Sequence, residues 1–469
     1  MEASLFEEFN MAIKINRKLT AKKLLPKLEH FFKLSGQKIL SIEKNWRTSK
    51  GTPVFTEKGQ YATRGWTEWT QGFQFGSAVL QFDATGDDKF LDIGYKGTLK
   101  YMTSHVSHIG VHDHGFNNIS TYGNLRRLMR EGKVPYDSQE MNFYELALKV
   151  SGAVQAARWT SIPEGGYIYS FNGPHSLFVD TVRSLRVLAV GHQLGHSLMG
   201  EKDRKISLLE RLVQHAHSTA EYCIYYGEGR DHYDIRGRTA HESIFNLNDG
   251  SYRCPSSQQG YSPFSTWTRG LAWAICGYSE QLEFLMTLKD ADFKPFGGRK
   301  KLNAMMLRAA KATADFYIQN SCVDGIPIWD TGAPNIHCMR GYLTKRSNPN
   351  NNYEPVDSSA ASIAAQGLIR LGNYLVDSGE KSAGSKYRQA GLTVAATLLD
   401  EPYLSTESKH QGLVLHSIYH RPNGWDYVPR GNKIPFGESS MWGDYHAREL
   451  ALMLLREARG ECYMTFFDY

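Results

Sequence analysis

The segment Ser265–Thr287, STWTRGLAWAICGYSEQLEFLMT, is the clearest indication of how this chain folds. Its apolar residues recur at the spacing of an α-helix with a buried face. Trp267 and Arg269 stand near its start, directly after a loop rich in glycine and aromatic residues. Arginine is unfavourable beside the positive N-terminal end of a helix, so we expect Arg269 to have a partner of its own. The segment therefore predicts a buried helix that begins at a polar and aromatic pocket.

Helical periodicity of similar length recurs along the chain, with almost no credible strands between the helices. An all-α fold is therefore expected. The remaining segments that we predict as helices are Thr70–Ala84, Lys89–His105, Gln139–Arg158, Val179–Gly195, Ser207–Tyr225, Lys301–Asn320, Ser358–Asp377, Lys381–Leu399 and Met441–Arg459. We expect caps at Ser138, Ser265 and Asp357. Short β-hairpin loops over one rim are predicted at Gly166–Phe171, Leu413–Tyr419 and Trp425–Val428.

Tryptophan, histidine and aspartate concentrate at the junctions between these helices. Paired helices joined by such loops favour an α/α toroid, in which the loops at one end line a pocket. Nothing in the composition marks a hinge. We expect one domain overall, with residues 1–60 as an N-terminal helical extension packed on the barrel and residues 61–469 as the catalytic barrel.

The composition is that of a globular protein: 41% of the 469 residues are hydrophobic and 22% are charged. The net charge of +6, from 54 basic and 48 acidic residues, lacks the concentrated basic stripe of nucleic-acid-binding proteins. No apolar run approaches the roughly 20 residues that span a bilayer, and the start does not resemble a signal peptide. We expect neither nucleic acid nor membrane as a partner, a monomer or dimer, and a cytoplasmic or, with a trimmed signal, periplasmic protein.

Six scattered cysteines form no Cys-x-x-Cys pair, so free and mostly buried thiols are expected, with no zinc or disulfide framework. The stretch GVHDHGFN, residues 110–117, raises the question of a metal again. His112 and His114 reach one ion only from an extended strand, and no HExxH helix supports them. Three readings remain: a metal site, a polar turn, or a pocket loop in which Asp113 is a working carboxylate held by its neighbours.

A second carboxylate suited to acid/base work is Asp180, which follows an apolar triplet and opens a predicted helix. Capping of that helix is the simpler role for an aspartate in this position. Catalysis is the alternative if desolvation or a like charge keeps the carboxyl protonated near neutral pH. His241 fits a buried imidazole as well as it fits a ligand-binding one. Trp267 offers a flat face to a sugar ring and Arg269 a bidentate partner for a carboxylate, whereas Trp273 fits the core.

Six motifs, in one order, give the chain a resemblance to a known family. They are WTQGFQFG with ATGD, HDHGF, FVDTVRSL, QGYSPFSTWTRGLAWAICGY, PVDSSAASIAAQGL and SSMWGDYHARELAL, and they run from about Trp66 to Leu454. In this order they resemble the unsaturated glucuronyl hydrolases of glycoside hydrolase family 88. The tryptophan-x-arginine-glycine segment with its upstream Gln-Gly-Tyr is the most specific of them.

The resemblance implies an (α/α)6 barrel that acts on oligosaccharides ending in a 4,5-unsaturated uronic acid. Such enzymes hydrate the C4=C5 enol ether, and the resulting hemiketal opens with loss of the aglycone sugar. No cofactor and no metal are implied. By motif matching, Asp180 would be the general acid/base and Asp113 would assist it. The sugar and carboxylate pocket would be formed by Trp69, His112, His241, Gln259, Trp267 and Arg269.

Two departures from the family pattern stand out. Phe171, which we also predict to bind substrate, lies where a tryptophan is often found a little before the catalytic aspartate. Extra residues fill the first 60 positions and the region of Asp290–Asn352. Three other functions stay open: an exo-acting glucuronidase on saturated uronides with the same aspartates, a catalytically inactive sugar-binding barrel, and a polysaccharide lyase with Tyr261 as a weak candidate base. The parent polysaccharide is not apparent.

Overall fold

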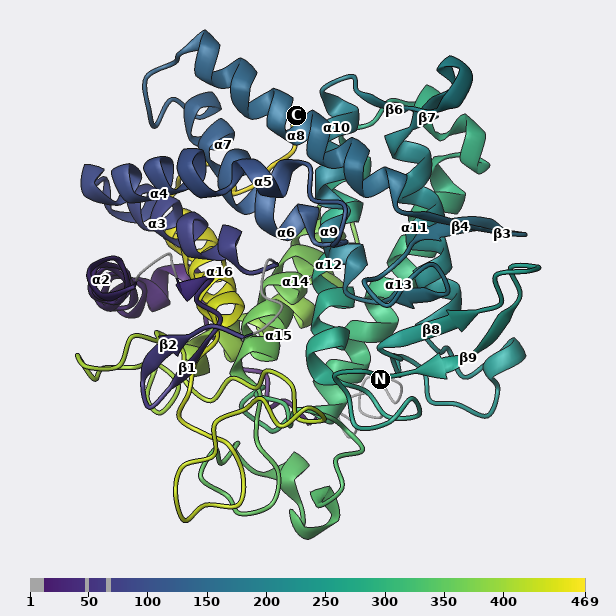
Figure 1. Ribbon diagram of the computed structural model, residues 1–469. Coiled ribbons are helices and arrows are strands. Elements are labelled where there is room, and N and C mark those ends of the chain that lie inside the picture. Colours follow the sequence, from purple (N-terminus) through teal and green to yellow (C-terminus); the bar gives the residue numbers. More distant parts are fainter. Residues whose placement is uncertain (1–11, 47–49, 65–68, 469) are drawn as a thin grey trace.

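The computed structural model describes residues 12–46, 50–64 and 69–468. Of the described residues, 53% are helical, and the strands are short, which confirms the all-α prediction. Within the described residues, six helical segments form an inner ring and six helices cover it (Figure 1). The predicted (α/α)6 barrel is therefore confirmed.

The inner ring closes on itself. Contacts run from α3 to η2, from α6 to α9, from α9 to α12, and then through α14 and α16 back to α3. These segments are buried almost all round, as expected of helices surrounded by other helices. The inner segments are α3 (Gln71–Thr85), α6, η2 and α7 (His114–Asn118, Ile119–Gly123 and Asn124–Arg130), α9 and α10 (Thr181–Ser184 and Arg186–Gln193), α12 (Thr268–Met286), α14 (Ser358–Asp377) and α16 (Met441–Arg459).

The outer helices bury one face each. In α4, for example, the buried residues Phe90, Gly94, Gly97 and Thr98 form a stripe at helical spacing, and the rest of the helix is more exposed. The N-terminal helix α2 packs on α16 and α3, where it covers the point at which the ring closes. The outer helices are α2 (Ala21–Asn45), α4 (Asp88–Tyr101), α8 (Ser138–Ala157), α11 (Leu208–Tyr222), α13 (Arg299–Asn320) and α15 (Lys381–Leu398).

The strands are short and antiparallel. Three two-stranded hairpins form from β1 with β2, β3 with β4, and β6 with β7, and β5, β8 and β9 form a three-stranded sheet. Their bounds are Phe55–Glu57, Gln60–Ala62, Trp159–Ile162, Gly165–Ile168, Ser176–Phe178, Ser197–Met199, Lys205–Ser207, Glu242–Phe245 and Tyr252–Ser256 for β1 to β9. Short helices are α5 (Thr103–Val106), η3 (Glu201–Asp203), η4 (Gly229–Asp231), η5 (Asp290–Phe296), η6 (Ile336–Cys338) and η7 (Tyr342–Thr344).

All ten predicted helical segments contain helix, although two of them are interrupted and their ends differ by a few residues. The prediction missed the inner segment α6–η2–α7. Its small and polar residues, among them Asn117, Asn118 and Thr121, hide the apolar periodicity, and a π-helical turn breaks its register. Of the expected caps, Asp357 is confirmed. Asp137 caps α8 in place of Ser138, and α12 begins three residues after Ser265.

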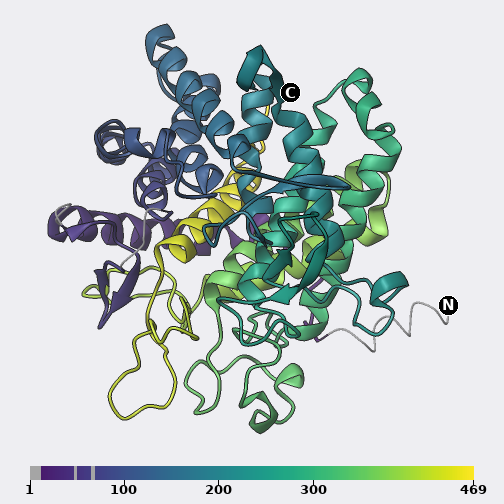
Figure 2. The same cartoon turned by 45° about the vertical axis from the view of Figure 1, so that its right-hand side comes forward.

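The hairpin expected at Gly166–Phe171 is confirmed in part, because β4 pairs with β3. The hairpin expected at Leu413–Tyr419 is confirmed only as a single antiparallel bridge of Val414 with Leu404, and the one expected at Trp425–Val428 is wrong, since no strand forms there. The backbone N–H groups of Leu413 and Val414 donate to the Asp444 carboxylate, and those of Tyr419 and His420 donate to Asp426. Side-chain carboxylates thus bind backbone N–H groups that a longer hairpin would pair with a strand. The segment between α15 and α16 and the segment between α13 and α14 lie at the same end of the barrel (Figure 2).

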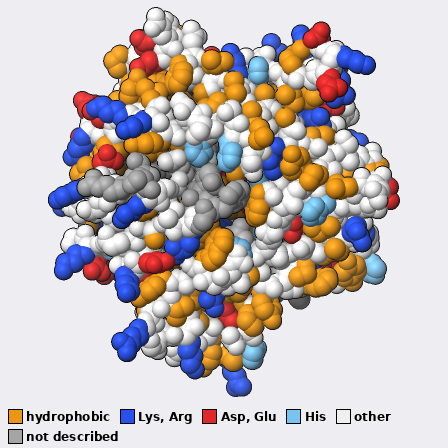
Figure 3. Space-filling view, in the orientation of Figure 1, with side chains coloured by type: hydrophobic (Ala, Val, Ile, Leu, Met, Phe, Trp, Pro, Cys, Tyr) orange, Lys and Arg blue, Asp and Glu red, His pale blue; other side chains and the backbone are white. Residues whose placement is uncertain are grey.

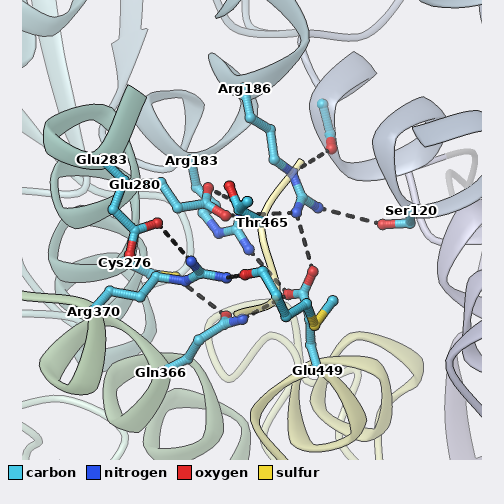
Figure 4. A network of polar contacts seen from close by, with 12 residues as sticks. Ser120, Arg183, Arg186, Cys276, Glu280, Glu283, Gln366, Arg370, Glu449 and Thr465 are labelled. Carbon is cyan, nitrogen blue, oxygen red and sulfur yellow. Dashed lines mark hydrogen bonds and ion pairs between the residues drawn. The ribbon is translucent and has the colours of Figure 1, made fainter. Parts of the chain in front are cut away.

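A network of buried charges crosses the inside of the ring (Figure 4). Glu449 of α16 accepts hydrogen bonds from Arg183 at 3.0 Å, from Arg186 at 3.2 Å and from Gln366 at 3.1 Å. Arg183 also pairs with Glu280 of α12. The two arginines and Glu449 are fully buried, so the network ties four inner helices to one carboxylate.

The segment after α16 folds back over the end of the ring that lies opposite the helix starts. Tyr463 donates to Glu283, and Arg370 donates to the carbonyl oxygen of Met464 at 3.3 Å. The Asp468 carboxylate accepts a bidentate pair from Arg126, both at 2.9 Å. These contacts close that end of the barrel.

Charges of both signs are interspersed over the face shown in Figure 3, with apolar side chains between them. In the described part of the chain, no helix is both long enough and apolar enough to span a bilayer. All six cysteines are free, but three of them, Cys254, Cys338 and Cys462, are exposed. The expectation of mostly buried thiols is therefore wrong.

The central network yields a test of stability. In Glu449→Ala, Arg183 and Arg186 remain buried without their main counter-charge, so we expect a loss of about 3–5 kcal/mol in the free energy of unfolding. Denaturant unfolding measures it. The control Lys96→Ala removes the exposed pair of Lys96 with Asp92 and should leave the unfolding midpoint unchanged. An equal effect of the two substitutions would show that the network is not what holds the ring.

Candidate active site

The helix starts of the inner ring meet at one cup. Its wall is made by side chains that stand at or just before the first turns of α3, α6, α9 and α12, with Phe171 and Phe178 from the β4–β5 region and Gln259 from the loop after β9. The lining residues are Trp69, His112, Asp113, Phe116, Phe171, Phe178, Asp180, Gln259, Trp267, Arg269 and Trp273. Eight of the nine predicted site residues are among them. The ninth, His241, lies directly behind this wall.

Asp180 is brought to the cup by the sheet. Phe178 of β5 pairs with Glu242 of β8, and the N–H of Val179 donates to the carbonyl oxygen of His241 at 3.0 Å. This register places Asp180 beside His241. Asp180 occupies the N-cap position of α9, but its side chain makes no capping hydrogen bond. The capping role considered for this aspartate is therefore wrong, and its buried Oδ1 atom has no hydrogen-bond partner in the structure.

The loop with His112 and Asp113 reaches the same point because α6 and α9 approach each other closely. A Cβ atom on Gly115 would lie 2.0 Å from the carbonyl oxygen of Ser184, so only glycine fits there. The Ser184 hydroxyl accepts the N–H of Gly115 at 2.8 Å. The backbone of His112 is fixed from the other side by Gln155, which donates to its carbonyl oxygen at 3.0 Å.

The two histidines of this loop have different surroundings. His114 lies in α6, and its ring nitrogens contact the Ser151 hydroxyl at 2.9 Å and the carbonyl oxygen of His108 at 2.8 Å. His112 faces the carboxylates instead. Its Nε2 atom lies 3.5 Å from Oδ1 of Asp180 and 3.8 Å from Oδ1 of Asp113. The imidazoles do not converge as two ligands of one metal would, and the polar-turn reading does not account for a histidine between two carboxylates.

The carboxyl groups differ in their affinity for protons. Burial raises the pKa of Asp113 to about 6, and the negative charge of Asp180 adds to this effect. Burial also acts to raise the pKa of Asp180, but His112, His241 and Arg269 together hold it below its ordinary value. We expected a raised pKa at Asp180. In this structure Asp113 has the raised pKa instead, because Arg269 acts on Asp180 and His112 lies nearer to Asp180 than to Asp113.

His241 stands behind Asp180 as a neutral ring. Its Nδ1 atom accepts the backbone N–H groups of Gln258 at 3.0 Å and Gln259 at 3.3 Å, so the hydrogen is on Nε2. Burial lowers its pKa to about 3. The Nε2 atom is buried and has no partner in the structure. It is thus a donor available to a bound ligand.

Arg269 has the partners that its place in the helix predicted. It donates to Oε1 of Gln259 at 2.7 Å, to the carbonyl oxygen of Tyr419 at 2.7 Å and to that of Ile418, and it approaches Asp357 at 3.5 Å. The guanidinium lies over the Trp267 and Trp442 rings, 4.6 and 4.9 Å from their centroids. The buried arginine therefore joins the starts of α12, α14 and α16.

Aromatic rings line the rest of the cup. Phe116 and Trp273 lie 4.8 Å apart, and Trp69 lies 4.9 Å from Trp442. Trp273 was assigned to the core; it is buried and also lines the cup. Phe116, Phe178 and Tyr419 were not among the predicted site residues. The first follows the HDHG motif directly, but nothing near Tyr419 in the sequence signals its position.

The cup is narrow in this structure, with a cavity of about 30 Å³. This is room for about one water molecule, so a sugar ring enters only when wall side chains move. Phe171 is 42% exposed and lies parallel to the His112 ring, at 6.3 Å and 15°. Side-chain rearrangements of this kind are common on binding.

Comparison with known proteins identifies relatives of this chain. No family model matches it. It is 24% identical over 393 residues to an unsaturated glucuronyl hydrolase of Formosa agariphila. The aligned region covers 81% of this chain and 78% of that protein. It is 23% identical to an unsaturated glucuronyl hydrolase of Bacillus sp. strain GL1, over 86% of this chain and 90% of the other. An unsaturated chondroitin disaccharide hydrolase of Streptococcus agalactiae is 22% identical, over 83% and 82%.

Solved structures agree in fold. The unsaturated glucuronyl hydrolase of Bacillus sp. GL1 superposes with a TM-score of 0.67 at 20% identity, over 91% of this chain and 95% of the other. One specific for heparin superposes with a TM-score of 0.68 at 19% identity, over 93% and 98%. The chain is thus a distant relative of the unsaturated glucuronyl hydrolases, and both the resemblance that its motifs indicated and its assignment as a hydrolytic enzyme are confirmed.

Proposed function

We propose that this enzyme releases a 4,5-unsaturated uronic acid from the non-reducing end of oligosaccharides that polysaccharide lyases produce. In this proposal the enzyme hydrates the C4=C5 double bond, with Asp180 as general acid/base and Asp113 assisting. The main support is the concentration, in and directly behind one cup, of buried polar atoms that have no hydrogen-bond partner among the described residues: Oδ1 of Asp180, Nε2 of His241 and both ring nitrogens of His112. Such atoms are costly unless a ligand satisfies them.

The shape of the cup supports a chain end as substrate. Trp69, Trp267 and Trp273 offer flat apolar faces to a pyranose ring, and the floor between Phe116 and Trp273 is closed. The converging N-terminal ends of the inner helices favour a negative charge, as on a uronate. Gln259 keeps its amide NH₂ as a donor, because its oxygen is occupied by Arg269. Gln259, His241 and Arg269 are therefore the groups we assign to the carboxylate side.

In the reaction, a proton is added to C4 and positive charge develops at C5 and the ring oxygen. Water then adds to C5, and Asp180 takes up a proton from it. Asp113, 4% exposed, is ionised above its pKa of about 6 and stabilises the positive charge. The hemiketal formed at C5 opens and releases the aglycone. The sensitive bond is C4=C5, so the spacing of the carboxylates does not predict retention or inversion.

The substrate class follows the relatives. The related Bacillus structure is described as responsible for glycosaminoglycan degradation, and another is specific for heparin. We propose unsaturated glycosaminoglycan oligosaccharides as the substrates of this enzyme. The assay is loss of ultraviolet absorbance on chondroitin, heparin and other lyase digests. Consumption of a saturated glucuronide, with no loss of absorbance on any digest, would instead identify a glucuronidase.

Asp180→Asn tests the general acid/base. We expect kcat to fall at least about 1000-fold, because an amide neither donates nor accepts the reacting proton. Substrate binding, measured by calorimetry, should stay within about tenfold, since the amide preserves the shape of the cup. Near-normal turnover would remove Asp180 from the mechanism.

The pKa of Asp113 predicts how activity changes on the acid side of its pH profile. Its pKa of about 6 means that the carboxylate is ionised above this pH and neutral below it. We expect kcat/KM to decrease as the pH falls through about 6, and Asp113→Asn to lower kcat/KM and abolish this dependence. An unchanged acid limb in the variant would assign it to another group.

Gln259→Glu tests the carboxylate side without disturbing the wall. The new carboxylate still accepts from Arg269, so the melting temperature should be preserved. It loses the amide donors and places a negative charge beside the substrate carboxylate, so KM should rise by about tenfold or more with a smaller change in kcat. An unchanged KM would place the substrate carboxylate elsewhere in the cup.

A further inference from the structure

His112 lies in an unusual position for a histidine. It is 2% exposed, its Nε2 atom approaches one oxygen of Asp180 and one of Asp113, and neither ring nitrogen has a hydrogen-bond partner among the described residues. A buried imidazole with both nitrogens unsatisfied is destabilising unless it is used. Motif matching assigns His112 only to the sugar pocket, which leaves its contact with both carboxylates unexplained.

The orientation of the ring is set by packing. Phe171 stacks parallel to it, and Phe178 meets it edge-on at 5.6 Å between centroids and 87° between planes. Gln155 fixes the backbone carbonyl. Apolar contacts therefore direct Nε2 to the carboxylates. Its polar atoms are free for proton chemistry.

The charges around the ring decide where a proton resides. Asp113 lies on the same loop, Asp180 at the start of α9, Arg158 at the end of α8, His215 on α11 and His241 beside β8. His215 and His241 are neutral, with pKa values lowered to about 3 by burial. Burial also disfavours a charged His112, but Asp113 and Asp180 outweigh it and raise the pKa of His112.

This distribution creates a problem for the reaction. Protonation of C4 needs a proton at Asp180, but the groups around Asp180 hold its pKa below the ordinary value. The raised pKa of His112 and the lowered pKa of Asp180 favour the proton on the imidazole over the proton on the carboxylate. Nε2 and Oδ1 lie 3.5 Å apart without a hydrogen bond, so a direct transfer requires the two side chains to approach to about 3 Å.

We propose that His112 is a proton relay that stores the reacting proton and exchanges it with Asp180, held between Asp180 and Asp113 by its position. This inference rests on the proposed function. The N–H bond at Nε2 breaks as an O–H bond forms at Oδ1 of Asp180. That proton then passes to C4, and the C4=C5 electron pair forms the new C–H bond. Water adds to C5, its proton goes to Asp180, and from there it returns to Nε2.

The cycle consumes one water and no net proton. Asp113 acts in it by charge: it stabilises the imidazolium before the transfer and the positive C5 after it. The relay thus gives both carboxylates and the histidine separate tasks. It also accounts for the low proton affinity of Asp180, since a carboxylate that returns its proton must be a weak base.

The test is His112→Gln, whose amide reaches the same region and donates a hydrogen bond but cannot carry a proton. We expect kcat to fall about 100-fold or more with KM within about threefold. In the wild-type enzyme activity should fall as the pH rises through the raised pKa of His112, and in the variant this alkaline limb should move. His105→Gln is the control, because His105 is buried beside Gln71 and Asn117 outside the cup. It should keep the wild-type limb.

A kcat within threefold of wild type and an unmoved alkaline limb in His112→Gln would overturn the relay. A second measurement does not need activity or a folded His112 variant. In wild-type protein labelled with ¹⁵N-histidine, the His112 ring should titrate above the ordinary value of 6.5, and in Asp180→Asn it should titrate at lower pH. A His112 that is neutral below 6.5 in the wild type would overturn the relay. Failure of the wild-type enzyme on every lyase digest would overturn the proposed function alone.

Discussion

The architecture depends on the ion network around Glu449. A ring of six inner helical segments has an axis that side chains must fill, and here charged groups fill part of it. Glu449 holds Arg183, Arg186 and Gln366, and Arg183 reaches on to Glu280. Buried charges tolerate few arrangements, because each one needs its partner. The network therefore fixes how the inner helices are placed relative to one another.

The geometry of the cup depends on how these inner helices are placed. Asp180 starts α9, which also carries Arg183, and α12 carries both Arg269 at its start and Glu280 about three turns further along. The same helices that meet around the network thus present the site at their N-terminal ends. Arg269 is a second buried charge that fixes its surroundings, at the opening of the cup. It donates hydrogen bonds to Gln259 and to the carbonyl oxygens of Ile418 and Tyr419. The geometry of the site therefore depends on the packing of the core.

Much of this was predictable from the sequence, for identifiable reasons. Apolar periodicity predicted five of the six outer helices and five of the six inner segments. The motifs around Asp113, Asp180 and Arg269 brought eight of nine predicted residues to one cup. The polar segment α6–α7 was missed because its burial is by polar contacts and close helix approach, as at Gly115. A local sequence pattern does not reveal polar contacts or close approaches between helices.

The incomplete hairpin near Leu413, the absent one near Trp425 and the proton distribution share another cause. Extended segments near Tyr419 are held by Asp426 and Asp444, carboxylates that only the fold brings there. The pKa of Asp180 likewise depends on His112 and His241, which approach from different elements. Residue type predicts that a carboxyl group is present; the sum of its neighbours decides whether it is charged.

The closed floor has a consequence for the order of events in turnover. Phe116 and Trp273 block the cup from below, and the segment with Tyr463 and Met464 covers the far end of the ring. Among the described residues, entry and exit therefore share one opening. In the proposed reaction the aglycone would occupy that opening when the bond breaks, so it would depart first, and the uronic acid would leave only afterwards. The uronic acid would then be the product that competes with the next chain end.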